Sequence, residues 1–160
     1  MVTINYCDIK GLLLTAFGRI AVVVMMFLLM PGMAWAAIVI DETNFPDENF
    51  RQCLLSQYYG EDGELTNLEI RAVTRLYLTE KGIKSLEGIN ALTELKELYC
   101  ERNQLTELDV SALTALETLY CSDNQLTSLN VSGCKSLTSL SSANNQLTKF
   151  DVSKCTYPSI

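Results

Sequence analysis

The 160-residue sequence contains no histidine, so it lacks the side chain that most often serves as a catalytic base. Serine–histidine and cysteine–histidine nucleophile pairs are therefore excluded. The sequence also lacks Cys-x-x-Cys pairs, which are typical of zinc sites, and it has no glycine-rich phosphate-binding loop. These absences predict a non-catalytic chain that needs no cofactor and holds no metal.

Positive charge is also scarce in this chain. Lysine and arginine number 12 against 19 aspartate and glutamate residues, which gives a net charge of −7. Such a balance disfavours nucleic acid and anionic membrane surfaces as partners. Its more common consequence is solubility, and the length indicates a single domain.

Only one long uncharged run is present, from Ile20 to Ile40, and two basic residues precede it. Pro31-Gly32 interrupts this run, and Ala34-Trp35-Ala36 supplies small residues at the positions that a signal peptidase reads. We expect residues 1–36 to be a signal peptide cleaved after Ala36, which leaves a secreted or surface-displayed chain with no membrane insertion. An uncleaved anchor stays open as the alternative, because about 20 apolar residues can span a bilayer as a helix.

The rest of the chain is dominated by a repeat with a step of 21 residues. The segment Leu98-Tyr-Cys-Glu-Arg-Asn103-Gln-Leu105 recurs from Leu119 and from Leu140, and a looser copy begins at Leu76. A period in this range indicates a supersecondary unit that buries its apolar side by stacking on its own copies. Leucines and cysteines two residues apart would point inward from a strand, and the residues between them would be exposed on the other face.

The bend after each strand carries an asparagine, namely Asn103, Asn124 and Asn145. A short buried carboxamide can bond the unpaired backbone groups of a bend, so these side chains are expected to form a stacked structural ladder. Each repeat then returns along apolar residues such as Leu108 and Val110, which would form the convex side of the solenoid.

Residues 37–72 lack the repeat spacing but carry two helix signatures. The first is Pro46-Asp47 followed by apolar residues at intervals of three and four. Its expected apolar stripe comprises Phe50, Cys53, Leu54 and Tyr58. The second is Thr66-x-x-Glu69, which indicates a capping box, with Leu68 and Ile70 expected to make the first apolar contacts. This pair of helices is predicted to cap the first edge of the solenoid.

The loop between the two expected helices resembles the second half of an EF-hand. Gly63 would occupy the sharp-turn position and Glu69 the bidentate position. The same alignment places Tyr58 and Gly60 where oxygen ligands are required, so two of the side-chain ligands are missing. We therefore expect a degenerate EF-hand-like cap that keeps the geometry without a calcium ion.

Five of the six cysteines follow residue 36, an odd number that in an exported protein raises the question of disulfides. Cys100 and Cys121 occupy the same inward position in successive repeats, and Cys134 and Cys155 share another position. We expect them to be small core residues. Because adjacent strands lie about 4.8 Å apart, a disulfide between Cys100 and Cys121 stays open as a minority alternative.

The repeat units resemble those of the bacterial internalin-like leucine-rich-repeat surface proteins. Asn103-Gln-Leu-Thr-Glu-Leu-Asp-Val-Ser111 and its copy from Asn124 carry the resemblance, which covers residues 73–155. It implies an α/β solenoid, a right-handed leucine-rich-repeat superhelix with a parallel concave β-sheet and an N-terminal helical cap, with repeats over residues 73–160. It also implies an exported protein that recognises a protein partner, often from a host. Internalins have more repeats, an immunoglobulin-like region and often a wall anchor.

The outward residues of the expected strands form the candidate partner-binding face. They are Arg75, Tyr77, Thr79, Glu97, Tyr99, Glu101, Thr118, Tyr120, Ser122, Ser139 and Ser141. The three tyrosines form one column and offer the large amphipathic contact area that is typical of interface hot spots. They could equally serve as cross-strand packing pairs worth about 0.2–1 kcal/mol each, and both interpretations stay open.

Two other functional classes are less favoured. Glu97 and Glu101 share a strand face and could act as paired acids in an enzyme for wall polymers, although acids on a solvated face are usually only polar surface. Alternatively, the chain is a truncated or vestigial fragment of a larger surface protein, because the leucine series requires a leucine where Pro158 stands. An incomplete last repeat without a polar cap predicts self-association through the C-terminal edge.

Overall fold

The computed structural model of this protein describes the backbone of residues 37–150 and the side chains up to residue 148. The described residues belong to one structural unit, Ala36–Ile160. The expected signal peptide, Cys155 and the incomplete last repeat around Pro158 lie outside the described residues. No helix in the described part is both long and apolar enough to cross a membrane.

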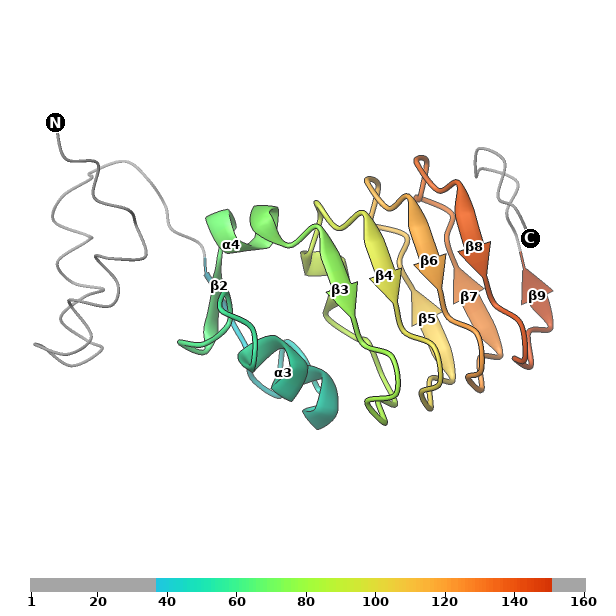
Figure 1. Cartoon of the computed structure of the whole chain (residues 1–160), viewed down its shortest axis with the longest axis horizontal. Coiled ribbons are helices and arrows are strands. Elements are labelled where there is room, and N and C mark those ends of the chain that lie inside the picture. Colours follow the sequence, from blue (N-terminus) through green and yellow to red (C-terminus); the bar gives the residue numbers. More distant parts are fainter. Residues whose placement is uncertain (1–36, 151–160) are drawn as a thin grey trace, which may run out of the picture. The chain divides into compact units, whose positions relative to one another are not determined.

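The described chain alternates short strands with turns after an N-terminal portion that holds the two α-helices (Figure 1). The elements are β1 (Ala37–Val39), α3 (Glu48–Leu55), β2 (Glu64–Thr66), α4 (Asn67–Ala72), β3 (Arg75–Tyr77), the 3-10 helix η1 (Ile89–Ala91), β4 (Glu97–Tyr99), β5 (Glu107–Asp109), β6 (Thr118–Tyr120), β7 (Ser128–Asn130), β8 (Ser139–Ser141) and β9 (Lys149–Phe150). We call Ala37–Ala72 the N-terminal helical segment.

Two parallel sheets build the repeat region, as the solenoid prediction requires. The larger sheet has the order β3-β4-β6-β8, and a second sheet with the order β5-β7-β9 lies on the opposite side of the later coils (Figure 1). Strand pairing keeps the repeat register, with Leu98 opposite Leu76 and Leu119 opposite Leu98. The sequence predicts the larger sheet but not the second one. On the expected convex side, each repeat shows only apolar residues on the return path of the chain, without a clear strand pattern.

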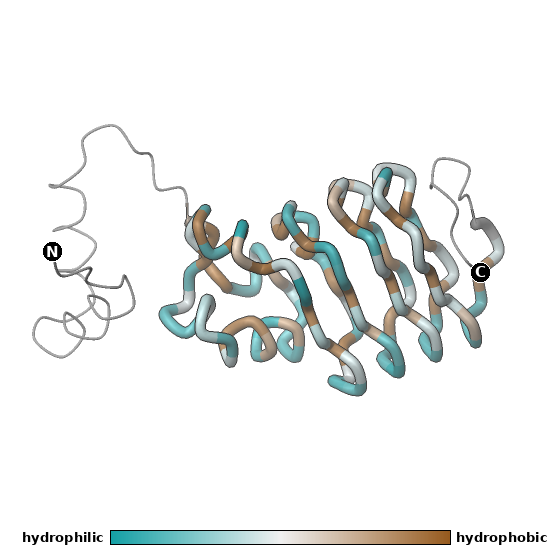
Figure 2. Tube along the Cα trace, turned by 45° about the horizontal axis from the view of Figure 1, so that its top comes forward, coloured by the Kyte–Doolittle hydropathy of each residue, from teal (hydrophilic) through white to brown (hydrophobic). Residues whose placement is uncertain are grey.

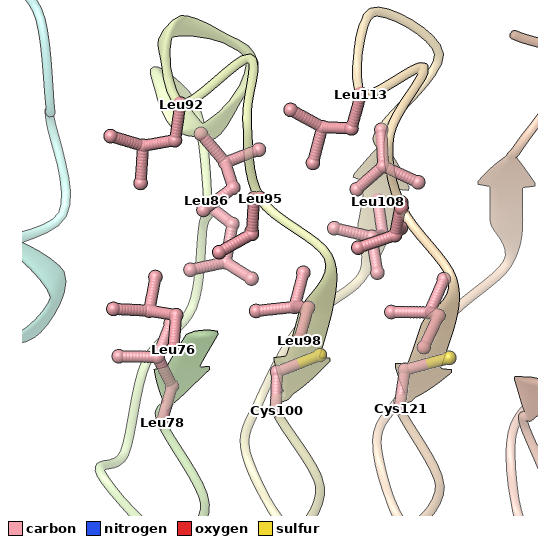
Figure 3. Close-up of a cluster of buried hydrophobic side chains, with 14 of the residues drawn as sticks. Leu76, Leu78, Leu86, Leu92, Leu95, Leu98, Cys100, Leu108, Leu113 and Cys121 are labelled. Atoms are coloured by element: carbon pink, nitrogen blue, oxygen red, sulfur yellow. The ribbon is translucent and has the colours of Figure 1, made fainter. Parts of the chain in front are cut away.

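Leucines from both sheets fill the interior of every coil. Leu98 and Leu119 are fully buried on the larger sheet, and Leu108 faces them from β5 with only 3% of its surface exposed. Figure 3 shows Leu98 and Leu108 pointing into the interior of the coils, with Cys100 and Cys121 at equivalent places in successive coils. Figure 2 shows the alternation of hydrophobic and hydrophilic residues along each strand. Burial of this interior supplies the main driving force for stacking.

The asparagines after the strands hold successive coils together. The Asn124 amide nitrogen donates to the carbonyl oxygens of Cys100 at 3.0 Å and Cys121 at 3.1 Å, and its oxygen accepts from the Leu105 backbone N–H at 3.1 Å. Asn103 and Asn145 make equivalent bonds. Each carboxamide thus satisfies backbone groups of its own coil and of the preceding one.

The N-terminal helical segment agrees with the expected helix starts and differs at their ends. Asp47 caps α3 by accepting from the Phe50 N–H, and a capping box formed by Thr66 and Glu69 opens α4. The expectation for Tyr58 is wrong, because α3 ends at Leu55 and the Tyr58 side chain is 73% exposed. Tyr59 is buried in its place.

The apolar contact expected of Leu68 is also wrong. Its side chain is 58% exposed, whereas Ile70 is buried. Helix α4 has only six residues, so its single buried face is narrow. Leu68 is two positions from Ile70 and therefore points to another side of the helix.

Candidate functional site

The outward residues of β3, β4, β6 and β8 form one continuous surface, which we call the concave face. Strand register aligns Arg75, Glu97, Thr118 and Ser139 in one row and Tyr77, Tyr99, Tyr120 and Ser141 in the next. Thr79, Glu101 and Ser122 follow their strands at the same interval, so the structure brings all eleven candidate residues onto this face.

The tyrosines pack against one another along their row. The ring centroids of Tyr77 and Tyr99 lie 4.9 Å apart with an interplanar angle of 12°, which is a stacked pair. Tyr99 and Tyr120 meet edge to face at 5.4 Å and 89°. Contacts of this kind contribute about 0.5–1.5 kcal/mol beyond simple burial. The column is therefore a preordered aromatic surface.

Exposure differs along the aromatic column. Tyr77 is 63% exposed at the end of the row, whereas Tyr99 and Tyr120 are half-buried. Glu97 and Glu101 are also half-buried, so Glu97, Tyr99 and Glu101 face outward as expected but are less exposed than the sequence predicts. Side chains in register sit on strands about 4.8 Å apart, and each ring covers its neighbour.

The two concave-face glutamates are already engaged by neighbouring groups. Glu97 pairs with the Arg75 guanidinium through Oε1 at 3.0 Å and accepts from the Tyr99 hydroxyl through Oε2 at 3.0 Å. The bond to Glu97 raises the pKa of Tyr99. Glu101 accepts from the Thr79 hydroxyl at 3.0 Å. Both carboxylates therefore act as acceptors that order the face.

The buried cysteines belong to the core behind this face. Cys100, Cys121 and Cys134 have at most 1% of their surface exposed, and Cys100 and Cys121 are free thiols. Burial, with Glu101 nearby, raises the pKa of Cys121 to about 12. The structure therefore contains no Cys100–Cys121 disulfide, and the thiols pack as small apolar residues.

Sequence reasoning missed a second polar feature beside the concave face. A cleft of about 370 Å³ separates α3 from β3, and its lining includes Arg75, Tyr77 and Lys81. Lys81 stands where the later coils carry the ladder asparagine. The sequence contains little sign of the cleft, because the α3 residues that line it lie outside the repeat pattern.

The geometry defines a leucine-rich-repeat solenoid with an ordered concave face, and comparison with known proteins agrees. Residues 45–160 match the family model described as the Endo-beta-N-acetylglucosaminidase EndoS LRR domain. The chain belongs to this family of leucine-rich-repeat domains. The family description refers to the leucine-rich-repeat domain of an enzyme, and the match is to that repeat domain.

Solved internalin structures from Listeria monocytogenes are similar to this chain. The functional domain of InlJ, described as including a cysteine ladder, is 31% identical with a TM-score of 0.67, over 77% of this chain and 27% of that one. The internalin InlF from strain 4b F2365 is 22% identical with a TM-score of 0.53, over 77% of this chain and 45% of that one. The chain therefore spans less than half of either structure and is internalin-like. No curated protein matches it.

Proposed function

We propose that this chain is an exported, non-catalytic binding module that recognises a protein partner through its concave face. The observation that carries the proposal is the aromatic column, in which Tyr77, Tyr99 and Tyr120 are held in fixed geometry across three strands. Rigid tyrosines offer contact area at low entropic cost, which is the usual composition of an interface hot spot. Solenoids of this type use extended concave surfaces for binding.

The engagement of the acids supports a binding role over an enzymatic one. A general acid and its partner base need a carboxylate that is free to exchange a proton with substrate. Glu97 has both oxygens occupied, by Arg75 and by Tyr99, and Glu101 holds Thr79. These contacts give the carboxylates an ordering role on the strand face.

The proposal is tested with a double substitution, Tyr99→Ser and Tyr120→Ser. A partner is first isolated on the immobilised chain from cell-surface proteins, then purified, and its saturable affinity is measured by calorimetry. The double variant should weaken that affinity at least tenfold, because each lost aromatic anchor typically costs more than about 1 kcal/mol.

A convex-face variant, Glu107→Gln with Ser128→Ala, serves as the matched control because both positions are exposed on β5 and β7. Its affinity should equal that of the unmodified chain. The double tyrosine variant must keep a cooperative melt for the comparison to report on binding. Equal affinity in a folded double variant, or the absence of any saturable partner, would contradict the proposal and favour a fragment with no binding activity of its own.

A further inference from the structure

The first strand of the larger sheet has an open edge. β3 is hydrogen-bonded to β4 on one side and is the terminal strand of the sheet. The Leu78 N–H donates to the Tyr99 carbonyl at 2.7 Å, and the Thr74 carbonyl accepts from the Glu97 N–H, so the even-numbered residues face β4. Because successive residues of a strand alternate, the backbone N–H and C=O groups of Arg75 and Tyr77 point away from β4. Within residues 37–150, no backbone hydrogen bond is made to these groups on that side.

This open edge faces a cleft. Residues 75–78 form one wall, and Asn49, Gln52, Cys53, Ser56 and Gln57 of the α3 region line the other. The cleft has a volume of about 370 Å³, within the range of natural ligand sites. Figure 1 shows α3 beside β3 with no strand of the described chain between them. The backbone donors and acceptors on the open edge of β3 therefore lie beside the cleft.

The charge of the cleft is opposite to that of the chain. Its lining contains Arg75 and Lys81 and no carboxylate, although the chain as a whole carries a net charge of −7. Arg75 uses its Nε to bind Glu97, which leaves the rest of its guanidinium fork available. No ion pair involves Lys81 within the described residues. An anionic group is therefore the complementary occupant.

We infer that the cleft between α3 and β3 binds an extended acidic peptide segment, which adds to the β3 edge as a further strand. The open edge requires a ligand with alternating N–H and C=O groups, which a peptide backbone supplies and a free anion does not. Arg75 and Lys81 would bind its acidic side chains, and the exposed ring of Tyr77 would pack beside it. The cleft shares Arg75 and Tyr77 with the edge of the concave face, but the inference does not rest on Tyr99 or Tyr120.

A short peptide that alternates glutamate and valine, with blocked ends, is the probe. Titrated into the ¹⁵N-labelled full chain, it should give saturable shifts in the amide signals of Arg75 and Tyr77 and slow their hydrogen exchange. A matched peptide with glutamine in place of glutamate should bind at least about threefold more weakly, because it lacks the charge–charge contacts. A peptide N-methylated at alternate residues should show no binding, because it lacks one set of edge donors.

Lys81→Gln tests the cleft with a residue outside the concave face. The substitution should lower the affinity for the glutamate peptide about two- to fivefold, which is the range expected for loss of an exposed ion pair. It should also reduce the salt dependence of binding. Lys84→Gln is the matched control, because Lys84 is exposed three positions further on and does not line the cleft. Its affinity should equal that of the unmodified chain.

Several outcomes would overturn the inference. These are no saturable shift at Arg75 and Tyr77, equal binding of the glutamine or N-methylated peptide, and an unchanged affinity in Lys81→Gln. Acetate or hyaluronan oligosaccharides shifting the same amides more strongly than the peptide would assign the cleft to anions or acidic saccharides instead. Because the probe does not involve Tyr99 or Tyr120, its failure leaves the proposed concave-face function standing.

Discussion

At the scale of single residues, stability in this solenoid depends on side chains that satisfy the backbone where it bends. Each coil turns sharply after its strand, and the turn leaves peptide groups that no sheet can pair. The asparagine carboxamides take over these groups. At the same turns, one residue in each coil has a positive φ: Glu80, Arg102, Asp123 and Asn144.

Asn124→Ala should lower the free energy of unfolding by about 2–4 kcal/mol, because it leaves buried groups of Cys100, Cys121 and Leu105 without partners. Denaturant unfolding followed by circular dichroism measures the change. Asn67→Ala is the control, since Asn67 is exposed in the first turn of α4, and it should stay within about 0.5 kcal/mol. A similar small effect at Asn124 would contradict the assigned role.

Asp123 tests the backbone conformation at the turns. Its φ is 56°, a left-handed value that β-branched residues resist. Asp123→Val should cost about 1–2 kcal/mol, because it adds strain and loses the contact with the Asn144 amide at 2.7 Å. Asp123→Gly should be close to neutral, because relief of strain offsets the lost contact. Thermal melts of both variants give the comparison, and equal melting temperatures would refute the assignment.

At the scale of elements, helix α3 is anchored to the first coil through its cap. Asp47 caps α3 with Oδ1 and accepts with Oδ2 from the Lys84 N–H at 2.8 Å and the Ser85 N–H at 3.2 Å. Asn49 adds a bond to the Gly82 carbonyl at 2.9 Å. One carboxylate therefore both starts a helix and docks it.

Substitution of the two N-caps separates these roles. Thr66→Ala should cost about 1 kcal/mol, the usual value for a lost cap. Asp47→Ala should cost about 2–3 kcal/mol, because it also removes the charged acceptor of two backbone N–H groups in the first coil. Equilibrium unfolding of both variants measures the difference. Equal costs would mean that the contacts with Lys84 and Ser85 contribute nothing to docking.

The buried thiol of Cys121, directly after β6, makes the free energy of unfolding depend on pH in the alkaline range. Burial raises the pKa of Cys121 from its ordinary value of 9.0 to about 12, while the unfolded chain keeps the ordinary value. The contribution of this thiol is therefore complete below pH 9 and is lost as the pH rises toward 12. The free energy of unfolding should fall less steeply above pH 9 in Cys121→Ala than in the unmodified chain. Parallel slopes in the two proteins would contradict the expectation.

At the scale of the whole molecule, stability is a sum over stacked coils, so damage should stay local. The tightest stacking point among the described glycines is Gly133, where an added Cβ would collide with the Ser111 carbonyl oxygen. Because the obstructing atom belongs to the backbone of the preceding coil, no side-chain rotation can relieve the clash. Any larger residue must push two coils apart.

Gly133→Ala should cost about 2–3 kcal/mol, in the range of an overpacked core, and should act on one end of the solenoid. Native-state hydrogen exchange should show lost protection in β7 and β8 and retained protection in β3 and β4. Gly63→Ala is the comparison, because Gly63 has open space around it and should lose only about 1 kcal/mol to its φ of 85°. Loss of protection along the whole chain in Gly133→Ala would refute additive stacking.

The repeat period made the fold predictable from the sequence. Leu98, Cys100 and Asn103 recur at a constant step, and a constant step fixes strand register, the inward face and the asparagine bends without reference to distant contacts. The capping box at Thr66 was equally local, since its two bonds span four residues. Strand alternation alone was enough to assign the eleven candidate residues to one face.

Only the tertiary structure decided the features that depend on neighbours distant in sequence. Tyr58 and Tyr59 are adjacent and similar, and the end of α3 determined which of them is buried. Glu97 and Glu101, expected as acids on a solvated face, are held by contacts with Arg75 and Thr79 on the neighbouring coil. The cleft beside β3 exists because a non-repeating helix docks against the first coil, and a periodic pattern carries no information about what packs on its end. Periodicity specifies contacts within and between identical units, whereas the ends of the array depend on packing that only the folded chain reveals.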